Sequence, residues 1–90
     1  EAPPEARTPA LDLARAYAWF AEDPARSLAI LQTLNPQSPV APEADLLQAR
    51  ALLAIDLANR PTALVLLRRL ARRPGAIGDT AQDLVDLIGP

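Results

Sequence analysis

The stretch ADLLQARALLAIDLANRPTALVLLRRLARRPGAI, residues 44–77, decides the fold of this 90-residue chain. It is rich in Ala and Leu, which have high helix propensity, and Pro61 divides it into two segments of helical length. Proline is tolerated at the first position of a helix, where its missing N–H has no intrahelical partner. Pro74-Gly75 is a usual helix terminator at the far end. The stretch therefore predicts two consecutive helices joined by a short turn.

Proline in the position of a helix start recurs along the chain at Thr8-Pro9, Asp23-Pro24 and Ala41-Pro42. Each is followed by a further Ala/Leu-rich segment. Thr and Asp before the first helical residue are good N-caps. Together with the spacing of the apolar residues, these signals predict helices over 9–21, 24–34, 42–58, 61–73 and 79–88. Ala and Leu make up more than a third of the residues, and β-branched and aromatic residues are few, so the chain is expected to be all-α.

The five predicted helices fall into two pairs and a final single helix. Residues 1–8 (EAPPEART) have the composition of a Pro-rich linker, which leaves 9–90 as one helical domain. The helix over 42–58 is apolar nearly all round from Leu46 to Ala58, so it is expected to be central and mostly buried. The helix over 79–88 has one apolar and one acidic face, which suits a helix that closes the end of a stack.

Residues 35–42 (NPQSPVAP) form the longest internal break between predicted helices. Each of the three prolines fixes φ and pushes the preceding residue toward extended geometry, so the segment is expected to be a rigid connector. Pro36, Pro39 and Pro42 also have PxxP spacing, which makes a polyproline ligand the alternative interpretation.

Residues 44–77 resemble a tetratricopeptide repeat, a helix-turn-helix unit of about 34 residues. Several positions of this segment carry the small or large apolar residue that the family's pattern has there. These matching positions are Leu47, Ala51, Ala63, Leu67 and Pro74. Arg50, usually Leu, and Ala54, usually a large aromatic residue, depart from the pattern. Residues 7–40 look like a more degenerate copy, in which LDLARAY (11–17) matches the first helix and Ser27 takes the place of an Ala.

The resemblance implies a short solenoid of two stacked antiparallel helical hairpins with a C-terminal capping helix. It also implies a scaffold or adaptor that binds a protein or peptide in a groove lined by the first helix of each pair. The positions that match this groove are Arg15, Trp19, Gln48, Leu52, Ile55 and Asp56. LDLARAY is similar to repeats of bacterial envelope and pilus-assembly proteins, so the cytoplasm and the cell envelope both remain open. Because the chain begins at Glu1 without Met, it is expected to be a domain of a larger protein. It is expected to be monomeric, because the other helices can surround the apolar helix over 42–58 within one chain.

The composition narrows the other classes of function. The absence of Cys and His removes the usual zinc sites, disulfides and Ser-His or Cys-His nucleophiles, so no enzyme activity, metal, cofactor or small-molecule substrate is expected. No apolar run reaches the roughly 18 residues that span a bilayer. A net charge of −2 gives no general attraction to nucleic acid.

Two charged groups carry alternative interpretations. The cluster Arg68, Arg69, Arg72 and Arg73 offers phosphate contacts for a nucleic acid, but it is better explained as a solvated helix end that faces the acidic stripe of the next helix. That stripe consists of Asp79, Asp83 and Asp86. The remaining rival to a binding module is a structural domain, whose apolar residues would bury against a second copy.

Overall fold

The computed structural model describes residues 8–88, and within that range every regular element is helical. The elements are α1 (Pro9–Phe20), α2 (Pro24–Gln32), α3 (Ala41–Ile55), a short 3-10 helix η2 (Leu57–Asn59), α4 (Arg60–Ala71) and α5 (Ala76–Ile88). The predicted all-α class is confirmed for the described part of the chain. Most of the predicted linker 1–8 lies outside the described residues.

The first two helices begin as the capping signals predict. Pro9 and Pro24 are the first residues of α1 and α2. The Thr8 hydroxyl accepts a hydrogen bond from the Leu11 N–H at 3.1 Å, and the Asp23 carboxylate accepts one from the Arg26 N–H at 3.1 Å. Each side chain satisfies one backbone donor that the helix itself leaves unpaired.

The predicted helix over 42–58 ends three residues early. Asp56 is extended (φ −163°, ψ 131°), and its carboxylate accepts a hydrogen bond from the Ala58 N–H at 2.9 Å. The Asn59 side chain donates to the Leu52 carbonyl at 2.9 Å and so satisfies the end of α3. Short polar side chains that bond to nearby backbone compete with the helix in this way.

The predicted start of the last helix at residue 79 is also wrong, because α5 begins at Ala76. Gly75 has φ 101°, a left-handed conformation that glycine adopts without a steric penalty. The chain reverses there, and the Asp79 N–H already donates to the Gly75 carbonyl at 3.1 Å. Asp79 therefore lies in the first turn of α5 rather than at its beginning.

The connector between α2 and α3 forms two successive turns. The Ser38 N–H donates to the Asn35 carbonyl at 2.9 Å, and the Ala41 N–H donates to the Ser38 carbonyl at 3.0 Å. The Asn35 side chain also accepts a hydrogen bond from the Gln37 N–H, and the Ser38 hydroxyl accepts one from the Val40 N–H. A polyproline II helix has no internal hydrogen bonds. The connector therefore has the geometry of hydrogen-bonded turns and not that of a polyproline II helix.

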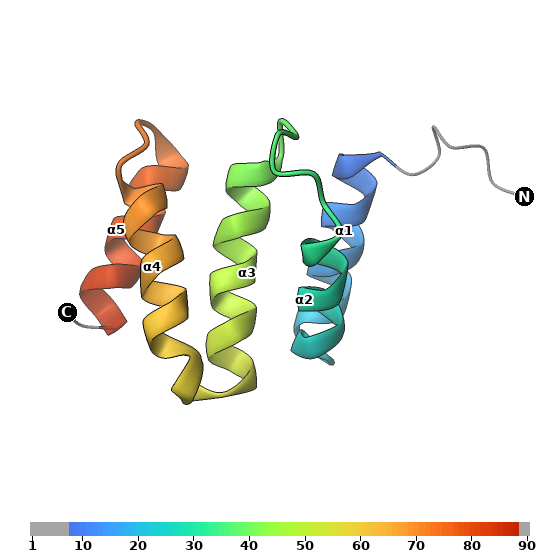
Figure 1. Cartoon of the computed structure of the whole chain (residues 1–90), viewed down its shortest axis with the longest axis horizontal. Coiled ribbons are helices and arrows are strands. Elements are labelled where there is room, and N and C mark those ends of the chain that lie inside the picture. Colours follow the sequence, from blue (N-terminus) through green and yellow to red (C-terminus); the bar gives the residue numbers. More distant parts are fainter. Residues whose placement is uncertain (1–7, 89–90) are drawn as a thin grey trace, which may run out of the picture.

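Consecutive helices run in alternating directions and lie side by side, with α1 and α5 at opposite ends of the row (Figure 1). The described chain measures 47 × 28 × 16 Å along its principal axes. None of the helices in residues 8–88 combines the length and the apolar character needed to cross a bilayer.

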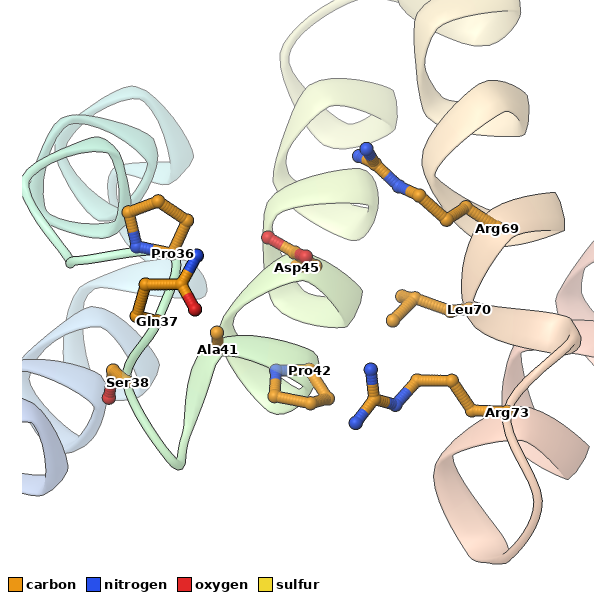
Figure 2. Close-up of a pocket in the computed structure, with 9 residues that line it drawn as sticks. All are labelled: Pro36, Gln37, Ser38, Ala41, Pro42, Asp45, Arg69, Leu70 and Arg73. Carbon is orange, nitrogen blue, oxygen red and sulfur yellow. The ribbon is translucent and has the colours of Figure 1, made fainter.

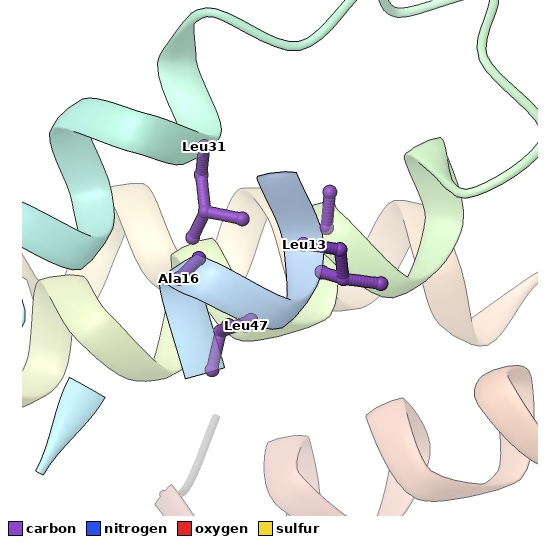
Figure 3. Close-up of a cluster of buried hydrophobic side chains, with 5 residues drawn as sticks. Leu13, Ala16, Leu31 and Leu47 are labelled. Carbon is purple, nitrogen blue, oxygen red and sulfur yellow. The ribbon is translucent and has the colours of Figure 1, made fainter. Parts of the chain in front are cut away.

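Two clusters of buried apolar side chains lie on opposite sides of α3. The first joins α1, α2 and α3, and Figure 3 shows four of its members (Leu13, Ala16, Leu31 and Leu47). The second joins α3, α4 and α5 and consists of Ala49, Ala63, Leu67, Leu70 and Ala81. Helix α3 therefore is central, as predicted.

Burial does not extend over the whole predicted span 46–58. Residues 54–58 are exposed, with 41% of Ile55 and 75% of Leu57 accessible, because the chain turns away after Ile55. Ala51 and Ala63 are both fully buried, but Ala49, not Ala51, shares the second cluster with Ala63.

Candidate functional site

A hollow of about 580 Å³ opens between α1 and α2, and Trp19 lies in it. We call it the Trp19 hollow. Its lining combines apolar groups, charged groups of both signs and the Thr33 hydroxyl. The lining residues are Asp12, Arg15, Trp19, Arg26, Ala29, Ile30 and Thr33.

The guanidinium of Arg26 lies over the Trp19 ring, 4.0 Å from the ring centroid. A cation in this position is attracted by the negative face of the indole, by about 0.5–1 kcal/mol where the pair is exposed. Arg26 makes no ion pair within residues 8–88, so its N–H groups remain open to a ligand. Arg15 has a partner in Asp12, at 3.9 Å.

The turn between α1 and α2 brings Trp19 and Arg26 together. Residues 21–23 reverse the chain after α1, and the Asp23 cap fixes the start of α2. One residue after Arg26, the fully buried Ser27 hydroxyl donates to the Ala16 carbonyl at 2.7 Å. This bond between the two helices sets the register in which Arg26 covers Trp19.

The six groove positions predicted from the sequence do not gather in one place. Arg15 and Trp19 share the Trp19 hollow. Gln48 lines a separate hollow of about 280 Å³ between α2 and α3.

The other three positions lie toward the end of α3. Leu52 packs on the second cluster, Ile55 is partly exposed, and the Asp56 carboxylate caps η2. Arg26 and Ile30 also line the Trp19 hollow but were not among the predicted positions. The signal that points to them is the tight turn at 21–23, which brings the residues that closely precede and follow it in the sequence side by side.

Another hollow, of about 320 Å³, lies between the connector, α3 and α4 (Figure 2). We call it the arginine hollow, because Arg69 and Arg73 reach across it from α4 toward α3. Asp45 lies between these arginines and the connector, and Gln37 comes from the opposite wall. Burial raises the pKa of Asp45 above its ordinary value, although the charges of Arg69 and Arg73 act in the opposite direction.

The four arginines at the end of α4 do not form one patch. Arg69 and Arg73 line the arginine hollow. Arg68 instead lines a different hollow, of about 700 Å³, together with Arg60, Leu57 and Val65. We call this the Leu57 hollow.

The arginine cluster is exposed to solvent, as expected, and so is the acidic stripe of the next helix. Within residues 8–88, no ion pair joins the arginines of α4 to Asp79, Asp83 or Asp86. Asp86 instead accepts a hydrogen bond from Gln82 at 2.9 Å. The charges that α4 and α5 carry therefore face solvent or their own hollows.

Comparison of the chain with protein-family models, with curated protein sequences and with solved structures gave no match. The evidence for function is thus the geometry of the four hollows and the pattern of the sequence.

Proposed function

We propose that this chain is a protein–protein interaction module that binds a peptide segment of a partner in the Trp19 hollow. The observation that carries the proposal is the half-buried Trp19 side chain under the unpaired Arg26 guanidinium, in a hollow of about 580 Å³. Trp and Arg are the residues most often found to dominate binding energy at protein interfaces.

The architecture that we propose for this module is the tetratricopeptide-like stack of two helical hairpins and a capping helix. Alternating helix directions and packing between successive helices support it. Fully buried small residues at helix contacts support it as well. These residues are Ala16, Ser27, Ala49, Ala63 and Ala81. Small side chains let adjacent helices approach closely, as the repeat pattern requires.

The hollow offers a peptide two kinds of contact. Ala29, Ile30 and the free part of the indole provide an apolar floor for one side chain of the ligand. Arg15 and Arg26 stand at its sides and donate hydrogen bonds to backbone carbonyls or carboxylates. The apolar contact supplies most of the affinity, and the charges supply specificity.

The test is selection of a displayed random-peptide library on the immobilised chain, followed by calorimetry with the enriched peptides. We expect Trp19→Ala to weaken their binding by more than about fivefold, or about 1 kcal/mol, a loss that only a minority of interface residues exceed when they are truncated to Ala. Leu87→Ala is the control, because Leu87 is 82% exposed on α5 and lies outside the hollow. Circular dichroism checks that both variants keep their helical content.

Two outcomes contradict the proposal. One is a selection that enriches no peptide above an uncoated surface. The other is a set of peptides that bind Trp19→Ala as tightly as the unchanged chain while its helical content is intact.

A structural or self-association role is the second candidate, and the Leu57 hollow favours it. Leu57 and Val65 are 75% and 63% exposed there, beside Leu64 and Pro61. Apolar side chains gathered in one hollow are typical of surfaces that a further helix covers. A second copy of the chain would supply such a helix.

A further inference from the structure

Arg69 lies near the end of α4 and Arg73 two residues beyond that end, and both guanidinium groups extend into the arginine hollow (Figure 2). Neither guanidinium makes an ion pair within residues 8–88, although Asp45 lines the same hollow. Two cations therefore extend into the same hollow, on either side of Leu70, and neither makes an ion pair with the described part of the chain.

We propose that the arginine hollow binds a tetrahedral oxyanion, a phosphate group, between Arg69 and Arg73. This site goes beyond the proposed function, because it lies between α3 and α4 and shares no residue with the Trp19 hollow.

The donor set selects a tetrahedral ligand over a planar one. Each guanidinium can donate two parallel N–H bonds to a pair of oxygens. The two oxygens of a carboxylate are occupied by a single arginine, whereas the three terminal oxygens of a phosphate monoester can engage two. A phosphate also carries close to two negative charges at neutral pH.

The opposite wall of the hollow adds polar groups. The Gln37 side chain comes from the connector, and α3 begins at Ala41 and Pro42 beside it. The residue before α3, Val40, provides no side-chain cap, so the positive end of the helix dipole adds to the field of the two arginines.

Asp45 opposes the binding of an anion in this hollow. Its carboxylate lines the same cavity as the two arginines and repels a bound phosphate. Removal of the Asp45 charge is therefore expected to strengthen binding, whereas removal of either arginine weakens it. Phosphate affinity that rises when Asp45 is neutralised and falls when either arginine is neutralised would distinguish a defined site from general attraction of phosphate to arginine.

The experiment is an NMR titration of the ¹⁵N-labelled chain with inorganic phosphate and with acetate, at a constant ionic strength kept with sodium chloride. Phosphate is expected to shift the amides of residues 36–45 and the side-chain Nε signals of Arg69 and Arg73. Arg69→Gln and Arg73→Gln each weaken phosphate binding by about fivefold or more, and Asp45→Asn tightens it by about threefold.

Arg68→Gln is the matched control. Arg68 lies on the same helix but lines the Leu57 hollow, so its loss leaves phosphate affinity unchanged. If Arg73→Gln loses helical content, Arg73→Lys replaces it. Lysine keeps the charge but lacks the planar fork, and a reduced affinity is again expected.

A third arm uses O-phospho-L-serine. Tighter binding of this compound than of inorganic phosphate assigns the site to a phosphorylated residue of a partner, and the reverse order assigns it to free phosphate. The proposal is overturned if acetate binds as well as phosphate. Equal shifts at all arginines, or unchanged affinity in folded Arg69→Gln and Arg73→Gln variants, overturn it as well.

Discussion

At the scale of single residues, Ser27 couples the first two helices. It has no exposed surface, and its hydroxyl donates to the Ala16 carbonyl of α1 at 2.7 Å. Ala occupies the same space without this bond, so Ser27→Ala should lower the free energy of unfolding by about 1 kcal/mol. Urea unfolding measures the change, with the exposed Thr62→Ala as control. An unchanged free energy of unfolding would show that the hydrogen bond contributes nothing net.

Asp45 predicts a dependence of stability on pH. Burial raises its pKa above 3.8, so the folded chain holds this proton more tightly than the unfolded chain does. The contribution of Asp45 to stability is therefore fully present below pH 3.8 and declines as the pH rises through the raised pKa.

Above the raised pKa, the partly buried carboxylate of Asp45 lowers the free energy of unfolding, and the variant Asp45→Asn removes this effect. It is expected to be modestly more stable than the unchanged chain at pH 7, and the difference should close near about pH 3. Urea unfolding at both pH values measures it. Glu43→Gln, an exposed change on the same helix, should give no such gain. Equal stability of Asp45→Asn and the unchanged chain at pH 7 would contradict the raised pKa.

At the scale of elements, Gly78 controls how α5 joins the end of α4. It is buried in α5, and a Cβ atom added there would overlap the Arg73 carbonyl oxygen. Because that oxygen belongs to the backbone, the turn itself must move. Gly78→Ala should therefore lower stability by about 1–3 kcal/mol, even though Ala is the better helix former.

Thermal unfolding followed by circular dichroism tests this expectation. Thr80→Ala, on the exposed side of the same helix, serves as the control and should leave the midpoint unchanged or slightly higher. A higher midpoint for Gly78→Ala than for the unchanged chain would mean that the close approach of the two helices is absent.

At the scale of the whole molecule, the two candidate functions differ in whether a second copy of the chain covers the Leu57 hollow. The two apolar clusters of residues 8–88 already cover both sides of α3 within one chain. We therefore expect light scattering to give the monomer mass of 9.6 kDa from micromolar to millimolar concentration. A dimer that Leu57→Ser and Val65→Ser both dissociate would favour the structural role instead.

The fold class and the order of the helices were predictable from the sequence. Proline at the start of α1 to α4, Thr8 and Asp23 as caps, and the Ala/Leu content act within a few residues, so they work in the same way in any surroundings. The central position of α3 also followed from its apolar residues on every side. The end of α3 did not, because Asp56 and Asn59 bond to backbone groups that only the finished turn brings close.

The hollows were decided by the tertiary structure. Trp19 was a candidate from the groove positions of the repeat pattern, but its partner Arg26 depends on the crossing of α1 and α2 that the Ser27 bond fixes. Likewise, four arginines in one helix read as one basic cluster, whereas the packing of α4 sends Arg69 and Arg73 toward Asp45 and Arg68 to another face. Local sequence sets which residues a helix carries. Which of them meet depends on helix rotation and crossing, and these are set by contacts between residues far apart in the chain.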